Sequence, residues 1–93
     1  MLLIFCRPIF YIQHTLIQMD KQQKQLILLG ENVRKRRLAI GLSQEEFSDI
    51  AGVHRTYMSQ LEQGLRNPTY TTLKKVAKAL KCSVGELMGE KNA

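Results

Sequence analysis

The sequence predicts an all-α domain built from five short helices. Apolar residues recur at steps of three and four residues within 21–41 and 73–80, which is the spacing of one face of a helix. Glycines and the Asn67-Pro68 pair interrupt the chain between such stretches. No segment alternates apolar and polar residues with a period of two, so we expect no strand.

The first predicted helix covers residues 21–41 and ends at Gly41, where a left-handed cap is favoured. Its buried face is expected to consist of Leu26, Leu29, Val33, Arg37 and Ile40. Ser43 and Glu46 have the spacing of a capping box, which begins a second, short helix that stops at Gly52-Val53. The residues expected to point inward from this helix are Phe47, Ile50 and Ala51.

A third helix is predicted from about His54 to Gln63, with Gly64 as its stop. Its apolar face consists of Met58 and Leu61. A fourth helix follows Thr69, a favourable N-cap, and its apolar positions are Leu73, Val76, Ala77 and Leu80. A second capping box, from Ser83 to Glu86, opens a last turn that carries Leu87 and Met88.

Length and composition exclude several classes of protein. The 93 residues fit one domain, and a domain of this size buries only roughly 60% of its unfolded surface, too little for a deep substrate cleft. Two cysteines, Cys6 and Cys82, cannot make a disulfide framework, and we expect free thiols in a reducing cytosol. What remains is a small basic domain with a net charge of +6.

Residues 1–18 differ from the rest, with twelve apolar residues and the single charge of Arg7. The segment is too short and too interrupted to span a membrane, which needs about 20 mostly apolar residues. It also lacks the basic start and the small-residue cleavage site of a signal peptide. We interpret it either as an annotation artefact preceding a true start at Met19, or as an extension that packs on the domain, on a dimer partner or on a membrane surface.

The second and third helices have the spacing of a helix-turn-helix, with Gly52 in the turn. An ordinary corner between two helices has the same spacing, so the outward residues of the third helix decide the interpretation. They include one arginine and two glutamines that can reach base edges, hydroxyls that can reach phosphates, and no acidic residue. These residues are Arg55, Thr56, Tyr57, Ser59, Gln60 and Gln63. The pattern favours DNA as the partner.

The stretch GLSQEEFSDIAGVHRTYMSQLEQGLRNPTYTTLKKVAKAL resembles the lambda-repressor/Cro-like (Xre-type) helix-turn-helix family, over roughly residues 28–88. Within it, VHRTYMSQLEQGLRNPT is similar to restriction–modification controller proteins, in which Arg-Thr-Tyr opens the recognition helix. The resemblance implies the five-helix lambda-repressor-like fold and sequence-specific binding of double-stranded DNA.

The resemblance also implies roles for single residues. Gln44 matches a position that holds a phosphate at a helix N-terminus, and Arg55 matches one that contacts a base or a phosphate. An arginine can bond guanine O6 and N7 together. Base or phosphate contacts are expected from Thr56, Tyr57 and Ser59, and less strongly from Gln60 and Gln63. Arg66 and Asn67, in the loop after the recognition helix, match positions that hold the DNA backbone and set register, with help from Tyr70.

Arg37 and Glu62 match a buried ion pair that ties the first helix to the recognition helix, which is a structural role. The remaining charges of the run from Arg34 to Arg36 are expected to be mostly solvated, with a long-range attraction to DNA. The same holds for four lysines of the fourth helix and its end: Lys74, Lys75, Lys78 and Lys81.

One recognition helix reads too few base pairs to be selective, so we expect a homodimer on a palindromic operator. The surface left for pairing is the fourth helix and the last turn. Val84, Leu87 and Met88 are the interface residues considered, although the leucine and the methionine fit the core equally well.

We expect a bacterial transcriptional regulator, located in the cytoplasm at the nucleoid. The most specific role that we expect is autoregulatory control of a restriction–modification operon. A phage-type or toxin–antitoxin repressor is the alternative within the class. A protein–protein adaptor without DNA contacts is an alternative of another class, and a membrane-tethered regulator depends on residues 1–18 alone. We expect no enzyme activity, cofactor, small-molecule ligand or metal, since neither His14 nor His54 has a partner at ligand spacing.

Overall fold

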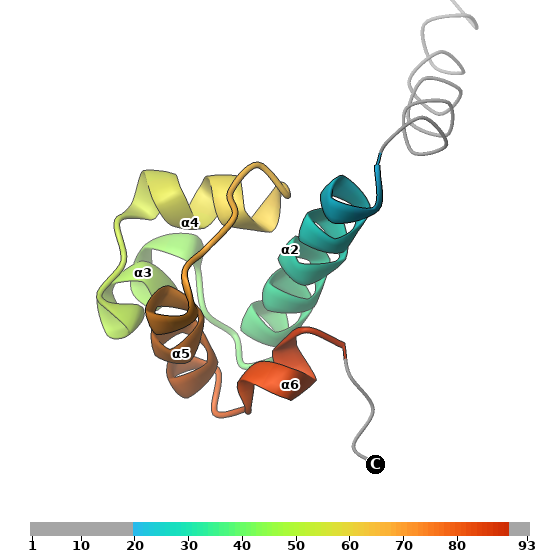
Figure 1. Cartoon of the computed structure of the whole chain (residues 1–93). Coiled ribbons are helices and arrows are strands. Elements are labelled where there is room, and N and C mark those ends of the chain that lie inside the picture. Colours follow the sequence, from blue (N-terminus) through green and yellow to red (C-terminus); the bar gives the residue numbers. More distant parts are fainter. Residues whose placement is uncertain (1–19, 90–93) are drawn as a thin grey trace, which may run out of the picture.

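The computed structural model describes residues 20–89, and the predicted extension at residues 1–18, with Cys6 and His14, lies outside them. The described chain is all-helical, as predicted, with no strand. Figure 1 shows α2 on one side of the molecule, α3, α4 and α5 stacked on the other, and α6 closing the end. The elements are α2 (Lys21–Ala39), α3 (Gln44–Ala51), α4 (Arg55–Glu62), α5 (Tyr70–Ala79) and α6 (Val84–Leu87).

Local side-chain caps set where the helices begin. The two predicted capping boxes are confirmed, because Ser43 and Ser83 each exchange hydrogen bonds with the glutamate three residues later. A third box, between Asp20 and Gln23, opens α2. Thr69 caps α5 through its side-chain oxygen, as predicted. Each cap satisfies backbone N–H groups that the first turn of a helix leaves without partners.

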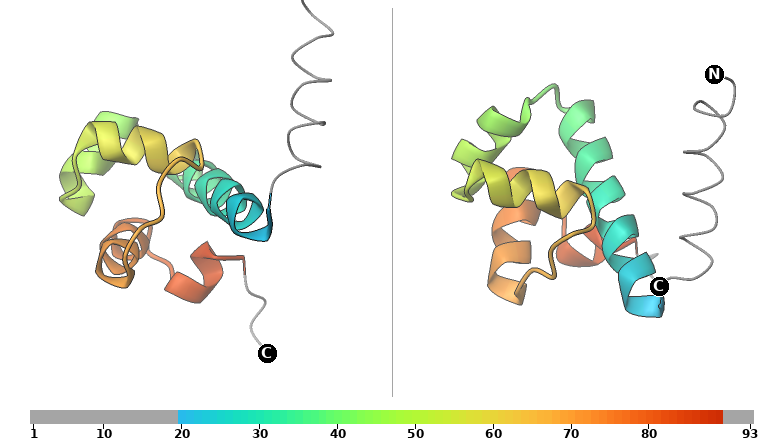
Figure 2. Two further views of the ribbon diagram at one scale, coloured as in Figure 1. Left: turned by 45° about the horizontal axis from the view of Figure 1, so that its top comes forward. Right: turned by 90° about the horizontal axis from the view of Figure 1, so that it is seen from above.

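One hydrophobic core joins all five helices in the described part of the chain. Its fully buried centre consists of large apolar side chains, namely Phe47, Met58, Leu61, Leu87, Val33 and Val76. α2 packs against α4 and α6, whereas α3 packs against α4 and α5 (Figure 2). The core therefore fixes α4 between α2 and α3 and leaves one of its faces toward solvent.

Two residues that we expected in the core are exposed. Ile40 is 44% exposed because α2 ends at Ala39 and Ile40 forms its C-cap. Ile50 is 60% exposed. The buried residues of α3 are Phe47, Ser48 and Ala51. At 3.6 residues per turn, Ile50 lies roughly 100° around the helix from the middle of that stripe.

Two further expectations change at the C-terminal end. Leu87 is fully buried, so for this residue the core is the correct alternative and a dimer contact is wrong. Val84 packs half-buried against the core, and Met88 is 52% exposed.

Arg36 is not simply solvated, because its guanidinium lies 3.7 Å from the carboxylate of Glu86 and so links α2 to α6.

Gly30 marks the closest approach of α2 to α4. A Cβ atom at this position would lie 2.5 Å from the backbone oxygens of Leu61 and Glu62. Glycine is therefore required by packing, although it lowers the intrinsic helix propensity of α2. None of the helices in residues 20–89 is long and apolar enough to cross a membrane.

Candidate DNA-binding surface

A tight turn joins α3 to α4. Gly52 ends α3 in the left-handed conformation, at φ 70° and ψ 33°, and the N–H of Val53 donates to the carbonyl oxygen of Ser48. α4 then begins at Arg55, and Nδ1 of His54 caps it by accepting from the N–H of Thr56 at 3.2 Å. α3, this turn and α4 together form a helix-turn-helix, and the polar N-terminal end of α4 faces solvent.

A buried ion pair holds α4 onto α2. The Arg37 guanidinium donates to Glu62 through Nε to Oε2 at 2.7 Å and through Nη2 to Oε1 at 3.0 Å. Its Nη1 also donates to the carbonyl oxygen of Leu42, at 2.8 Å. A two-point contact of this kind restricts both distance and orientation. It therefore fixes the orientation of α4 relative to α2, which is the structural role expected of this pair.

Gln44 is the first residue of α3, and its side chain joins this network. Its Nε2 donates to Oε1 of Glu62 at 3.1 Å, across the turn between the two helices. The half-buried amide is thus held beside the N-terminus of α3, where free backbone N–H groups favour an anion. One amide N–H is used inward, and the other remains for a ligand.

The predicted reading residues of α4 gather around a shallow, open hollow between α4 and the start of α3. None of the seven residues that line it is acidic: Gln44, Arg55, Thr56, Ser59, Gln60, Gln63 and Leu65. Arg55, Thr56 and Gln63 are exposed, whereas Tyr57, Ser59 and Gln60 are half-buried. The structure thus brings together six of the nine predicted DNA-binding residues in this hollow.

Contacts within this surface explain the half-buried residues. Arg66, in the loop between α4 and α5, donates from Nε to Oε1 of Gln60 at 2.7 Å. Its guanidinium carbon lies 5.2 Å from the centre of the Tyr57 ring, a cation–π distance. Nε2 of Gln63 is 3.1 Å from the hydroxyl oxygen of Ser59, one turn back on the same helix.

The other loop residues lie further along the chain. Asn67 is exposed and turns toward a different hollow, described below. Tyr70 is 66% exposed, and Nζ of Lys74 lies 5.4 Å from the centre of its ring. Asn67 and Tyr70 therefore do not line the hollow that Gln44 and Arg55 share.

Leu65 is a surface residue that sequence reasoning missed. It is 66% exposed and lines the hollow beside Gln60 and Gln63. Leu65 directly follows Gly64, where the helix ends, so it is not part of the apolar face of any predicted helix. That position was the signal in the sequence that its side chain could be exposed. An exposed leucine beside polar readers can contact the methyl group of thymine.

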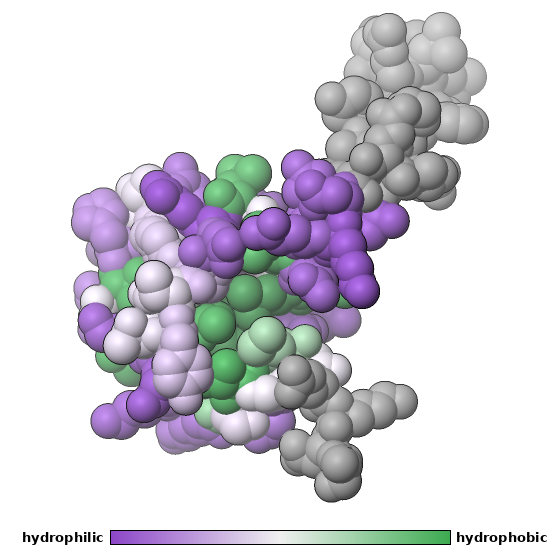
Figure 3. Space-filling view, in the orientation of Figure 1, coloured by the Kyte–Doolittle hydropathy of each residue, from purple (hydrophilic) through white to green (hydrophobic). Residues whose placement is uncertain are grey.

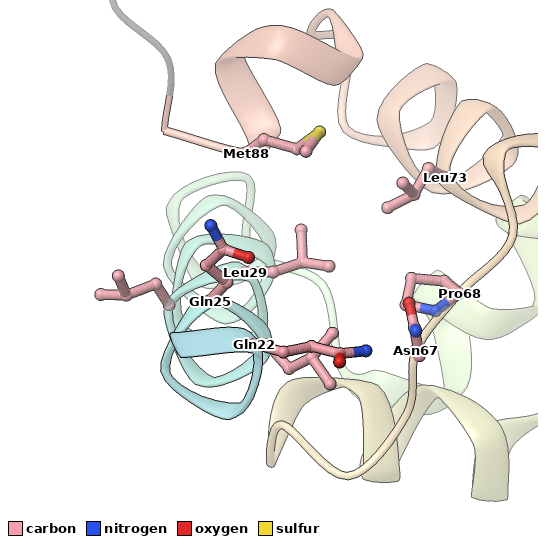
Figure 4. Close-up of a pocket in the computed structure, with 9 residues that line it drawn as sticks. Gln22, Gln25, Leu29, Asn67, Pro68, Leu73 and Met88 are labelled. Carbon is pink, nitrogen blue, oxygen red and sulfur yellow. The ribbon is translucent and has the colours of Figure 1, made fainter. Parts of the chain in front are cut away.

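A second hollow lies on another face of the molecule. Apolar atoms gather there between α2 and the α5–α6 side, framed by hydrophilic residues (Figure 3). Leu29, Leu73 and Met88 contribute apolar side chains to its wall, and Gln22 and Asn67 lie at its edge (Figure 4). The described residues include no group of three or more His, Cys, Asp or Glu side chains placed to hold a metal ion.

Comparison with known proteins agrees with this geometry. A helix-turn-helix family model (HTH_3) matches residues 33–87. The control protein C.SmaI of Serratia marcescens is 48% identical over 61 residues, which cover 66% of this chain and 73% of the relative.

Solved structures give the same result. The restriction-modification controller protein C.AhdI of Aeromonas hydrophila has a TM-score of 0.65 at 37% identity, covering 67% of this chain and 94% of that one. The N-terminal DNA-binding domain of SinR from Bacillus subtilis has a TM-score of 0.65 at 34% identity, covering 71% and 97%.

The fold and the surface define a helix-turn-helix domain whose second helix, α4, presents polar side chains to solvent. The chain belongs to the HTH_3 helix-turn-helix family, of the Xre or lambda-repressor-like type.

Proposed function

We propose that this protein is a sequence-specific transcriptional regulator that binds double-stranded DNA as a homodimer, in the bacterial cytoplasm. The observation that carries the proposal is the hollow between α4 and the start of α3, which six predicted readers and Leu65 line without an acidic residue. The face is rigid, because the Arg37–Glu62 pair and the buried Met58 and Leu61 hold α4 in place.

In this proposal α4 enters the major groove with its N-terminal end toward the base edges. Arg55 and Thr56 are exposed at that end. Arg55 has the fork of donors that matches guanine O6 and N7, and Thr56 can contact a thymine methyl or donate to an acceptor. The two residues supply direct reading of sequence.

In this proposal, residues on the two sides of α4 contact the phosphate backbone of the DNA. Gln44 stands at the N-terminus of α3, where its amide and the helix dipole together favour a phosphate oxygen. Arg66 follows α4 and lies exposed in the loop, whereas Asn67 borders the second hollow. Phosphate contacts on both sides fix the register of α4 without reading bases.

The particular role that we propose is control of a restriction–modification operon, including the protein's own gene. The support is similarity to C.SmaI and C.AhdI, which are named control or controller proteins. Similarity to SinR, named an HTH-type transcriptional regulator, keeps a repressor outside restriction–modification as the second candidate. The presence or absence of methyltransferase and endonuclease genes beside this gene separates the two.

We propose that the second copy docks on the apolar hollow of Figure 4. Met88 and Leu28, at 52% and 57% exposed, are large apolar side chains of its lining that the monomer leaves uncovered. Neither belongs to α4, so pairing there leaves the reading face free. A two-fold dimer places two α4 helices about 34–36 Å apart, in successive major grooves.

Binding of the full chain to labelled duplex from upstream of its own gene tests the proposal. We expect tighter binding to this duplex than to an unrelated duplex of equal length. We also expect a steep loss of affinity with salt, since 6–10 phosphate contacts cost about 10³–10⁵-fold between 50 and 200 mM. A response that is flat in salt and equal for both duplexes would favour the adaptor alternative.

A further inference from the structure

Arg66 fixes which side of the Gln60 amide faces solvent. Its Nε lies 2.7 Å from the Gln60 side chain, and a guanidinium has donors but no acceptor. The atom that faces Nε must therefore be the amide oxygen. The opposite orientation of the amide would place two donors against each other. Gln60 consequently turns its Nε2 group, with two N–H donors, away from Arg66.

One further contact holds Arg66 in this position. The guanidinium stacks near the Tyr57 ring, 5.2 Å from its centre, so the loop is anchored to two side chains of α4. A hydrogen bond from a charged donor is roughly twice as strong as one between neutral groups. The half-buried Gln60 is thus restrained by Arg66, within the hollow that Arg55, Thr56 and Leu65 also line.

Base chemistry gives this orientation a consequence. A glutamine with both amide groups free can pair with adenine, accepting from N6–H and donating to N7. With the oxygen turned toward Arg66, the opposite side of the amide presents its two N–H donors. In the major groove guanine presents two acceptors, O6 and N7, and thymine presents O4. Adenine presents one acceptor, N7, beside the N6–H₂ donor that opposes a second donor, and cytosine presents only the N4–H₂ donor.

We propose that Arg66 is a positioning residue that turns the N–H donors of Gln60 toward the bases, favouring guanine or thymine over adenine and cytosine at one base position. This inference rests on the proposed function, since it assumes that α4 enters the major groove. It adds a role in specificity to Arg66, for which backbone contact alone had been expected. Gln63 offers an internal contrast, because its amide pairs with a hydroxyl that can donate or accept, so its orientation stays adaptable.

Selection from a randomised duplex library with the full chain tests the inference. The Gln60→Ala variant first identifies the base pair whose preference collapses. At that pair we expect the unmodified chain to favour guanine or thymine by about tenfold or more, the discrimination of one good base contact. In Arg66→Met, which keeps an aliphatic stem but no donor, we expect adenine to rise to parity.

The readout is the ratio of bases at one position, which a purely phosphate-contacting arginine would not change. Such a role would lower affinity equally for all sequences. Arg34→Met, an exposed arginine of α2, is the matched control and should leave the ratio as it is. An unchanged ratio in Arg66→Met, or an adenine preference in the unmodified chain, would overturn the inference. Failure of the unmodified chain to enrich any sequence would instead contradict the proposed function.

Discussion

Arg37 and Glu62 lie 25 residues apart in the sequence and meet in a buried, two-point ion pair, at 2.7 and 3.0 Å. Removing one member leaves the other charge buried without a partner. We therefore expect Arg37→Met to lower the free energy of unfolding by on the order of 3–5 kcal/mol. Equilibrium unfolding in urea measures this.

Two further variants make that experiment specific. Arg34→Met removes an exposed charge from the same helix and should change the free energy by less than about 0.5 kcal/mol. The double variant Arg37→Met with Glu62→Leu removes both charges and should recover part of the loss. If Arg37→Met were as stable as Arg34→Met, the pair would contribute nothing to holding α4.

We expect Gly30→Ala to lower the free energy of unfolding, although replacing a glycine by alanine inside a helix usually raises it. At an exposed helical site this change stabilises by up to about 1 kcal/mol. Here the new Cβ would lie 2.5 Å from two backbone oxygens of α4, which have little room to move. We expect a net loss of about 1–3 kcal/mol in thermal or urea unfolding, against a near-neutral Glu31→Ala on the exposed face of α2. A stabilised Gly30→Ala would show that α2 and α4 pack less closely.

The capping boxes give stability a dependence on pH. The Ser43 N–H and then the Ser43 hydroxyl lower the pKa of Glu46 below its ordinary 4.5, and Ser83 lowers the pKa of Glu86 in the same way. A carboxylate whose pKa is lower in the folded chain stabilises the fold above the unfolded pKa. That contribution is lost as pH falls through the folded pKa.

We therefore expect the double variant Glu46→Gln, Glu86→Gln to lose less stability than the unmodified chain as pH falls from about 6 to 3. Glutamine keeps an acceptor for the N-cap but does not titrate. Urea unfolding at each pH gives the comparison. Identical slopes for the two chains would mean that these carboxylates are not held by their caps.

Met88→Glu tests the proposed dimer surface. Met88 is exposed at the edge of the apolar hollow, so a charge there should leave the monomer folded while opposing docking of a second copy. Sedimentation equilibrium of the full chain should show a weaker dimer for this variant. Ile50→Glu, an equally exposed apolar site on α3, is the control and should pair like the unmodified chain. Dimers unaffected by Met88→Glu would place the interface elsewhere.

Much of the fold is predictable because its signals are local. The capping boxes at Ser43 and Ser83 span three residues each, and the helical spacing of Leu73, Val76 and Leu80 reports directly on the buried face of α5. Their geometry follows from the helix itself and needs no knowledge of its neighbours.

What the sequence alone could not provide depends on distant contacts. The need for Gly30 comes from the backbone of α4, about thirty residues further along the chain. Ile50 is exposed because α3 is short and turns a different stripe toward α4 and α5. The bond from Arg66 to Gln60 depends on the path of the loop after α4, which no periodic pattern encodes.

The central claim is that α4 reads DNA through Arg55. The most direct measurement is a footprint of the full chain and of its Arg55→Ala variant on the DNA just upstream of the gene. We predict paired protected patches one helical turn apart, lost in the variant because one arginine–guanine contact contributes about 1–3 kcal/mol in each half-site. Protection that persists unchanged in Arg55→Ala would contradict the assignment of α4 as the reading helix.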